Sequence, residues 1–219
     1  MAAGDLSDAL RDRVRQRVGQ SSQSGLLDED IFAFLNRAQY DLGWRLHDAA
    51  MPELTEVASG SLTASRVALP TDFWREVTVD IGTGSSRQTC VRWPVTQLDA
   101  LDNNTLLTPS TSSPYYFIWY QATDAALRLI IDLGNAASTS AYQLRYVKLP
   151  TTMTTDVDPL YKSDKYGMIV DFACMMYHQM KGNDAQRARL WQQYIAQIIT
   201  VNTRYMPGTL HEGKPGDIG

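Results

Sequence analysis

The first fifty residues repeat apolar positions with the period of a helix. From Leu6 to Val18 an apolar residue recurs at every fourth position, which predicts a short amphipathic helix whose narrow stripe must pack on another element. From residue 31 to residue 49 the spacing is three and four, behind the acidic residues 28–30. Acidic side chains favour the positive end of a helix dipole, so we expect a second helix that begins there and ends before Pro52.

Between residues 53 and 150 the period changes to two. Val77, Val79 and Ile81 alternate with polar residues, as in a strand with one face in a core and the other in solvent. The sequence Gly-Thr-Gly-Ser-Ser at 82–86 then predicts a hairpin connection. Further strands are predicted at 54–58, 65–69, 88–93, 115–120, 127–132 and 141–148. Many short strands separated by turn residues indicate an antiparallel sandwich or partial barrel.

After residue 150 the helical period returns. Asp158-Pro159 is typical of a helix start, and one apolar face runs from Tyr166 to Met180 until Gly182 ends the helix. Asn183 begins a last helix, whose apolar residues run from 190 to 201. Because the joint between these helices is so short, we expect an antiparallel helical hairpin.

The order of these elements predicts an α+β protein. Since helices flank the sheet region in sequence, we expect a helical bundle made from the N- and C-terminal helices, with an inserted antiparallel β-sandwich or partial barrel. The expected divisions are 1–52 for the N-terminal helices, 53–150 for the β module, 151–206 for the C-terminal hairpin and 207–219 for a flexible tail. Within the β module we expect a short helix at 95–101 and a long exposed loop at 103–114.

The charge balance narrows the possible partners. Lys and Arg number 20 and Asp and Glu number 24, so the net charge is -4, which argues against a general affinity for nucleic acid or an anionic membrane. Apolar runs such as 115–120 are far shorter than the roughly 20 residues that cross a bilayer, so we expect no membrane anchor. Two cysteines, Cys90 and Cys174, are too few for a disulfide scaffold and indicate a reducing compartment.

One group of side chains on the helix after residue 158 could carry chemistry. Asp171, Cys174 and His178 fall at i, i+3 and i+7, and a Cys and a His four residues apart on a helix can share a metal ion or form a nucleophile and its base. No other His or Cys follows a metal-binding spacing. We therefore interpret Cys174 as a core residue and expect no catalytic residue, no metal and no cofactor.

The aromatic run at 115–120 (Tyr-Tyr-Phe-Ile-Trp-Tyr) is apolar on both faces of its predicted strand, so both faces must be covered. It could be a sugar-binding platform, a face between subunits or a central strand beneath the helical bundle. We favour the central strand.

Several short motifs, in order, resemble a known family. They are Leu69-Pro70-Thr71-Asp72-Phe73 before a strand, Tyr142, Leu144 and Tyr146 alternating before Leu149-Pro150, and a helical hairpin with Trp191 and Tyr194 in its second arm. Preceded by two helices, this order is similar to that of the head-to-tail adaptor, or connector, proteins of tailed bacteriophages. The resemblance covers residues 5–206.

The resemblance implies a structural virion protein without catalysis. Members form a ring, typically of twelve subunits, that docks beneath the portal protein in the neck of the virion. The ring extends the channel for double-stranded DNA, without sequence-specific binding, and presents a platform for tail, nozzle or stopper proteins. We expect assembly in the host cytoplasm.

Two sets of residues are candidates for these contacts. Candidates for contact with the portal or a neighbouring subunit are Arg11, Arg15, Arg187, Arg204, Tyr205, Pro207, Leu210, His211 and Ile218. Candidates for tail-side or intersubunit loops are Asn103, Asn104, Leu106, Leu107, Pro109, Thr83 and Ser85. Two alternatives stay open: a carbohydrate-binding β-sandwich that uses the aromatic run, and a small cytosolic enzyme that uses Cys174 and His178.

Overall fold

The chain divides into two compact units, seen here in a computed structural model. The structure describes residues 4–20, 26–63, 66–94, 96, 114–121, 126–132 and 140–205. The helical unit is formed by Met1–Leu54 with Leu149–Gly219, and the sheet unit by Thr55–Lys148. The described residues contain four α-helices and two four-stranded sheets, so the protein is α+β as predicted.

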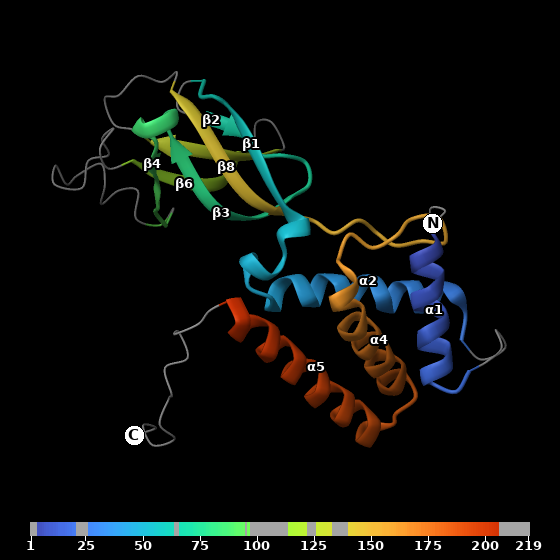
Figure 1. The fold of residues 1–219 in the computed structure, drawn as a ribbon. Helices are drawn as coiled ribbons and strands as arrows, with labels where there is room; N and C mark the ends of the chain where they lie inside the picture. The colour runs from blue at the N-terminus through green and yellow to red at the C-terminus, as the bar shows by residue number, and fades with distance from the viewer. Residues whose placement is uncertain are drawn as a thin grey trace, which may run out of the picture. The chain divides into compact units, whose positions relative to one another are not determined.

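One helix lies in the middle of the helical unit. The helices are α1 (Asp5–Arg17), α2 (Asp28–Arg45), α4 (Tyr166–Met180) and α5 (Asp184–Tyr205), and α4 packs against the other three (Figure 1). The predicted face was right at Ile169 and Ala173, which are buried, but it is too narrow for a helix that is covered on several sides. Every residue from Met168 to Met175 is buried, whereas Met180, placed on the predicted face, is 51% exposed.

The second helix ends earlier than the sequence predicted. α2 stops at Arg45, and residues 48–50 and 52–54 form short 3₁₀ turns. The side chain of Asn202 explains this end, because its Nδ2 donates to the Arg45 carbonyl oxygen at 2.8 Å and its Oδ1 accepts from the His47 N–H at 2.8 Å. An amide from α5 thus satisfies backbone groups that a continuing helix would have used.

Asp158 does not start a helix, so that prediction was also wrong. α4 begins at Tyr166, after a 3₁₀ turn at Ser163–Lys165. The Oδ1 atom of Asp158 instead accepts hydrogen bonds from the backbone N–H groups of Leu6 and Ser7, each at 3.0 Å. The residue has the chemistry of a helix cap, as the sequence indicated, but it caps α1, about 150 positions away.

The joint between α4 and α5 has the predicted form. Gly182 adopts a φ of 68°, and the Asn183 N–H donates to the His178 carbonyl oxygen at 2.9 Å, which is the pattern of a glycine-terminated helix. Asn183 then caps α5, since its Oδ1 accepts from the Gln186 N–H at 3.2 Å. The two helices pack together as a hairpin.

The sheet unit contains two sheets that share one core. The first has the order β1 (Thr55–Ser61), β8 (Ala141–Lys148), β3 (Phe73–Ile81) and β4 (Gln88–Thr89). The second has the order β2 (Arg66–Ala68), β7 (Ala126–Asp132), β6 (Tyr115–Gln121) and β5 (Val91–Arg92). One hydrophobic cluster includes Val79 and Leu144 from the first sheet and Leu129 and Ile131 from the second.

The predicted strand at 88–93 is two strands in different sheets. β4 pairs with β3, whereas β5 pairs with β6 in parallel, so the expectation of purely antiparallel sheets was wrong at this strand. Cys90 lies between the two strands and is buried in the shared core. The predicted loop at 103–114, except for Pro114, and the predicted tail at 207–219 lie outside the described residues. The predicted helix at 95–101 also lies outside them except for residue 96.

Candidate functional site

The Asp171, Cys174 and His178 group belongs to the interior of the helical unit. Asp171 is 1% exposed; it forms an ion pair with Arg17 of α1 and accepts a hydrogen bond from Gln197 Nε2 of α5 at 2.7 Å. Burial raises the pKa of this carboxyl, and Gln197 and Arg17 partly oppose that effect. Asp171 therefore connects three helices. Because Arg17 and Gln197 bind its carboxylate, Asp171 is poorly placed to act as a catalytic group or a metal ligand.

Cys174 is a core residue, as predicted. Its side chain is fully buried, and burial raises the pKa of the thiol to about 12. A thiol with so high a pKa stays protonated near neutral pH and is a poor nucleophile and metal ligand. His178 packs edge-on against the ring of Tyr177, with 5.4 Å between the centroids. Across the described part of the chain, no three His, Cys, Asp or Glu side chains are grouped to hold a metal ion.

The aromatic run forms β6, an inner strand of the second sheet. Tyr116 points into the shared core and is 5% exposed. Phe117, which alternation places on the opposite face, is 2% exposed, so both faces are covered as predicted. Tyr115 packs against Trp93 with ring centroids 4.9 Å apart. The rings of Tyr116 and Phe117 are therefore not available to a sugar, whereas Tyr115 and Trp93 are half-buried.

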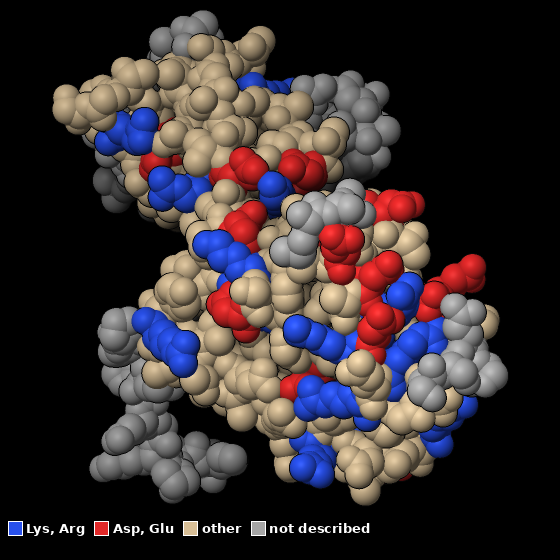
Figure 2. All heavy atoms as spheres, turned by 45° about the vertical axis from the view of Figure 1, so that its right-hand side comes forward, with Lys and Arg blue, Asp and Glu red and all other residues tan. Residues whose placement is uncertain are grey.

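Two of the predicted portal-contact arginines are already engaged within the helical unit. Arg11 pairs with Asp8 at 2.9 Å, Asp12 at 3.1 Å and Asp28 at 3.4 Å. Arg15 also pairs with Asp28 and is 7% exposed. These ion pairs connect α1 to the start of α2. On one face of this unit, Lys and Arg side chains are interspersed with Asp and Glu, so charges of both signs share that surface (Figure 2).

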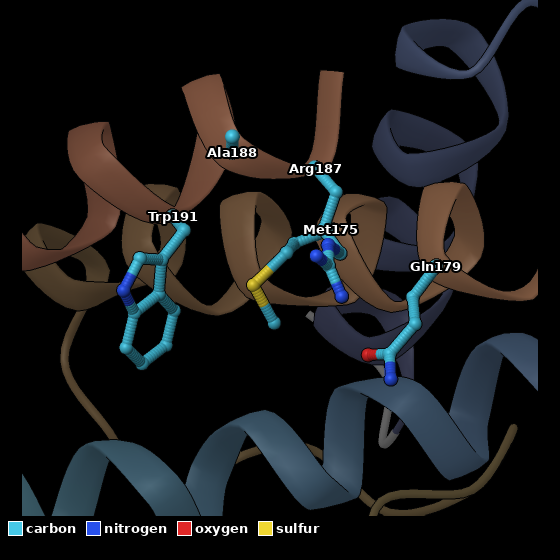
Figure 3. Close-up of a pocket in the computed structure, with 5 residues that line it drawn as sticks. All are labelled: Met175, Gln179, Arg187, Ala188 and Trp191. Carbon is cyan, nitrogen blue, oxygen red and sulfur yellow. The ribbon is translucent and has the colours of Figure 1, made fainter. Parts of the chain in front are cut away.

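Arg187 lies at a shallow hollow of about 380 Å³ between α4 and α5. The lining residues are Met175, Gln179, Arg187, Ala188 and Trp191 (Figure 3). The guanidinium also pairs with Asp184 at 3.3 Å on the exposed side of α5. The hollow combines an apolar wall with one cationic group, which is the composition of a protein-contact surface.

The wall of this hollow is held in place by α2. The guanidinium carbon of Arg45 lies 4.9 Å from the ring centroid of Trp191, a distance that gives a cation–π interaction. Asp41 positions that arginine, accepting from its Nε at 2.6 Å, and also accepts from the Tyr194 hydroxyl at 2.7 Å. The hydrogen bond to Asp41 raises the pKa of Arg45. Residue spacing in the sequence does not predict this link between α2 and α5, because its two halves lie about 150 residues apart.

A second buried interaction, between Lys165 and Glu53, is likewise not predictable from local sequence. Lys165 is 2% exposed, and its Nζ lies 2.9 Å from Glu53 Oε1. Glu53 also accepts from the Lys162 N–H at 3.3 Å. Sequence patterns place lysine in solvent, so nothing in the local sequence marks Lys165 as buried.

The remaining candidate residues are exposed or lie outside the described residues. Arg204 and Tyr205 are exposed at the end of α5. Thr83 and Ser85 are exposed in the turn between β3 and β4. The candidates outside the described residues are Asn103, Asn104, Leu106, Leu107, Pro109, Pro207, Leu210, His211 and Ile218. No helix among the described residues has both the length and the apolar content that crossing a membrane requires.

Comparison with known protein families identifies a match over most of the chain. The family model described as SU10 adaptor protein matches residues 1–210. No curated protein matches the chain. The match covers the two N-terminal helices, the sheet unit and the C-terminal hairpin, so it extends over the same elements as the resemblance drawn from the motifs.

Proposed function

The chain belongs to the SU10 adaptor protein family, a family of phage head-to-tail adaptors with a structural role, and from this premise we propose that it forms a ring beneath the portal protein. The ring has twelve subunits, extends the channel for double-stranded DNA and holds tail proteins in the virion neck. The family match over residues 1–210 is the observation that carries this proposal.

The architecture that we propose is a helical bundle with an inserted β-sandwich. Packing of α4 on the other three helices supports the bundle, and the hydrophobic cluster common to the two sheets supports the sandwich. Two modules of different composition offer unlike surfaces, and a ring needs unlike surfaces that meet head to tail. We assign the surface of Arg187, Arg204 and Tyr205, with the tail that follows them, to contacts with the portal or a neighbouring subunit.

The charge of the channel lining follows from its task. Basic side chains would hold phosphate groups and slow the DNA, so we propose a lining that is neutral or acidic. The net charge of -4 and the arginines of α1 that are neutralised by Asp8, Asp12 and Asp28 support this assignment.

Electron microscopy of the chain mixed with its purified portal protein tests the proposal. We expect one added ring layer on the portal, on the side that faces the tail. Portal particles that stay unchanged at a large excess of the chain would overturn it. The same mixture with residues 207–219 deleted tests the role of the tail. Unchanged binding would show that the tail takes no part in the portal contact.

The two alternatives have less support. A sugar-binding platform requires exposed aromatic rings, and Tyr116 and Phe117 are buried. A thiol enzyme requires an accessible, ionised cysteine, and the Cys174 thiol is buried, with its pKa raised to about 12. Binding to a glycan array would support the carbohydrate-binding alternative. Failure of a Cys174→Ala, His178→Ala variant to assemble complete virions would support the enzyme alternative.

A further inference from the structure

An aromatic pair on α2 faces away from the core of the helical unit. Trp44 is 63% exposed and Tyr40 is 38% exposed. They are four residues apart, which places them on one side of the helix, while Leu35 and Leu42 on the inner side are fully buried. Exposed Trp and Tyr side chains that lie together are characteristic of protein-contact surfaces.

A basic hollow on the same unit offers complementary chemistry. It measures about 410 Å³ and is lined by Arg13, Gln16 and Arg17 of α1 with Gly167 and Val170 of α4. Ligand pockets of about 300–1,000 Å³ bury most of the surface of a small molecule, so this hollow has room for an aromatic side chain. Arg17 is ion-paired with the buried Asp171, and a paired guanidinium still attracts the face of an aromatic ring.

Two features prepare this hollow for a ring. Arg17 is held by its ion pair with the buried Asp171, so little freedom is lost when its guanidinium stacks. Gly167 leaves the floor open, because a Cβ atom built there would meet only Gln197 Oε1 within 4 Å, at 3.9 Å. The chain already uses this type of contact internally, where Arg45 stacks on Trp191.

We propose that Trp44 and Tyr40 of one subunit dock into the hollow between α1 and α4 of a second copy of this chain. A second copy is the occupant we infer, because this chain itself carries both the exposed aromatic pair and the hollow with its two arginines. The two surfaces are different parts of one chain, so the contact is heterologous and repeats around a ring. This inference rests on the proposed function, because it identifies the contact that closes the proposed ring.

Cysteine cross-linking on the assembled portal complex tests the contact. In a Tyr40→Cys, Gln16→Cys double variant, mild oxidation should produce a ladder of covalent oligomers, since each subunit offers one cysteine to either neighbour. Each single variant should stay monomeric under the same oxidation, and the two single variants mixed should give only dimers. A complete ring without cross-links would overturn the inference, and so would dimers formed by either single variant alone, because they indicate a two-fold contact.

Side-chain variants provide a second readout. Trp44→Ala should lower the fraction of portals that carry a ring by about tenfold or more at limiting chain concentration, as for a central interface residue. Ile199→Ala is the matched control, since Ile199 is 55% exposed on α5 and should leave ring formation unchanged. Gly167→Leu should fill the hollow and block rings while the chain stays folded, because leucine favours a helix more than glycine does.

These outcomes separate the inference from the proposed function. If the unchanged chain adds no ring to the portal, the proposed function fails, and this contact fails with it. If the unchanged chain, Trp44→Ala and Gly167→Leu all form rings equally well, the proposed function stands and the contact is wrong. Circular dichroism spectra of the variants exclude unfolding as the cause of a loss.

Discussion

Asp158 holds the first turn of α1, so its replacement by alanine should release that helix from the rest of the helical unit. The residue before the helix, Gly4, has no side chain to cap it. The carboxylate of Asp158 fills this place and accepts from the N–H groups of Leu6 and Ser7, both at 3.0 Å. In Asp158→Ala these two donors lose their acceptor.

The magnitude follows from the number and type of the bonds. Loss of a helix cap costs about 0.5–2 kcal/mol, and a hydrogen bond to a charged group contributes about 1.5–3 kcal/mol. The site is partly buried, so water can replace part of the loss, and we expect about 2 kcal/mol. For a chain of this size 1 kcal/mol corresponds to about 2–4 °C in Tm, which gives a decrease of about 4–8 °C.

Thermal unfolding followed by circular dichroism, together with amide hydrogen exchange in α1, measures the effect. Asp156→Ala is the matched control, because Asp156 is an exposed aspartate of the same segment and should leave the Tm within about 1 °C, as surface substitutions generally do. Asp158→Asn keeps an acceptor oxygen and should fall between the two. An Asp158→Ala chain with an unchanged Tm and unchanged exchange in α1 would refute this reasoning.

Three further predictions concern buried groups of the helical unit. Lys165→Met should destabilise the protein by about 3–5 kcal/mol because it leaves Glu53 buried without its partner, whereas the Lys165→Met, Glu53→Met pair should recover most of that loss in chemical denaturation. The Cys174 thiol should not react with a thiol reagent at pH 8 until the protein unfolds, since its side chain is buried and burial raises its pKa to about 12; rapid labelling of native protein would contradict this. Burial raises the pKa of Asp171 above its ordinary 3.8, so this carboxyl contributes most to stability below pH 3.8 and loses that contribution as the pH rises through its raised pKa. The stability of the unchanged chain relative to Asp171→Asn should therefore fall over that range, and a rise would show that Arg17 outweighs burial.

Periodicity was sufficient to find most elements of this fold. The three- and four-residue spacing identified α2, and the alternation at 141–148 gave the bounds of β8. Gly182 and Asn183 marked the joint between α4 and α5, because their effect on the backbone is local. Signals of this kind can be read from the sequence because the residues that cause each element lie within that element.

The errors arose where a distant residue decides the local structure. Asp158 has a partner in α1 and not in the helix that follows it. α2 ends at Arg45 because Asn202 arrives from α5. The burial of α4 on several sides depends on three neighbouring helices, which its own periodicity does not encode. The spacing of residues in one sequence does not identify any of these distant partners.

The candidate contact residues show the same division. Arg15 looked available on a basic helix, but Asp28 neutralises it and the unit buries it. Trp44 lies within a helix whose apolar residues mostly point inward, and only its exposed fraction of 63% distinguishes it as a surface residue. The sequence therefore identified the class of protein, and the structure was needed to separate exposed residues from those that hold the unit together.

A reconstruction of the neck of the virion that contains this chain tests the account most directly. We expect one ring layer between the portal and the tail, with density that accommodates the helical unit and the sheet unit in every subunit. A neck in which that layer is absent, or is filled by another protein, would contradict the account.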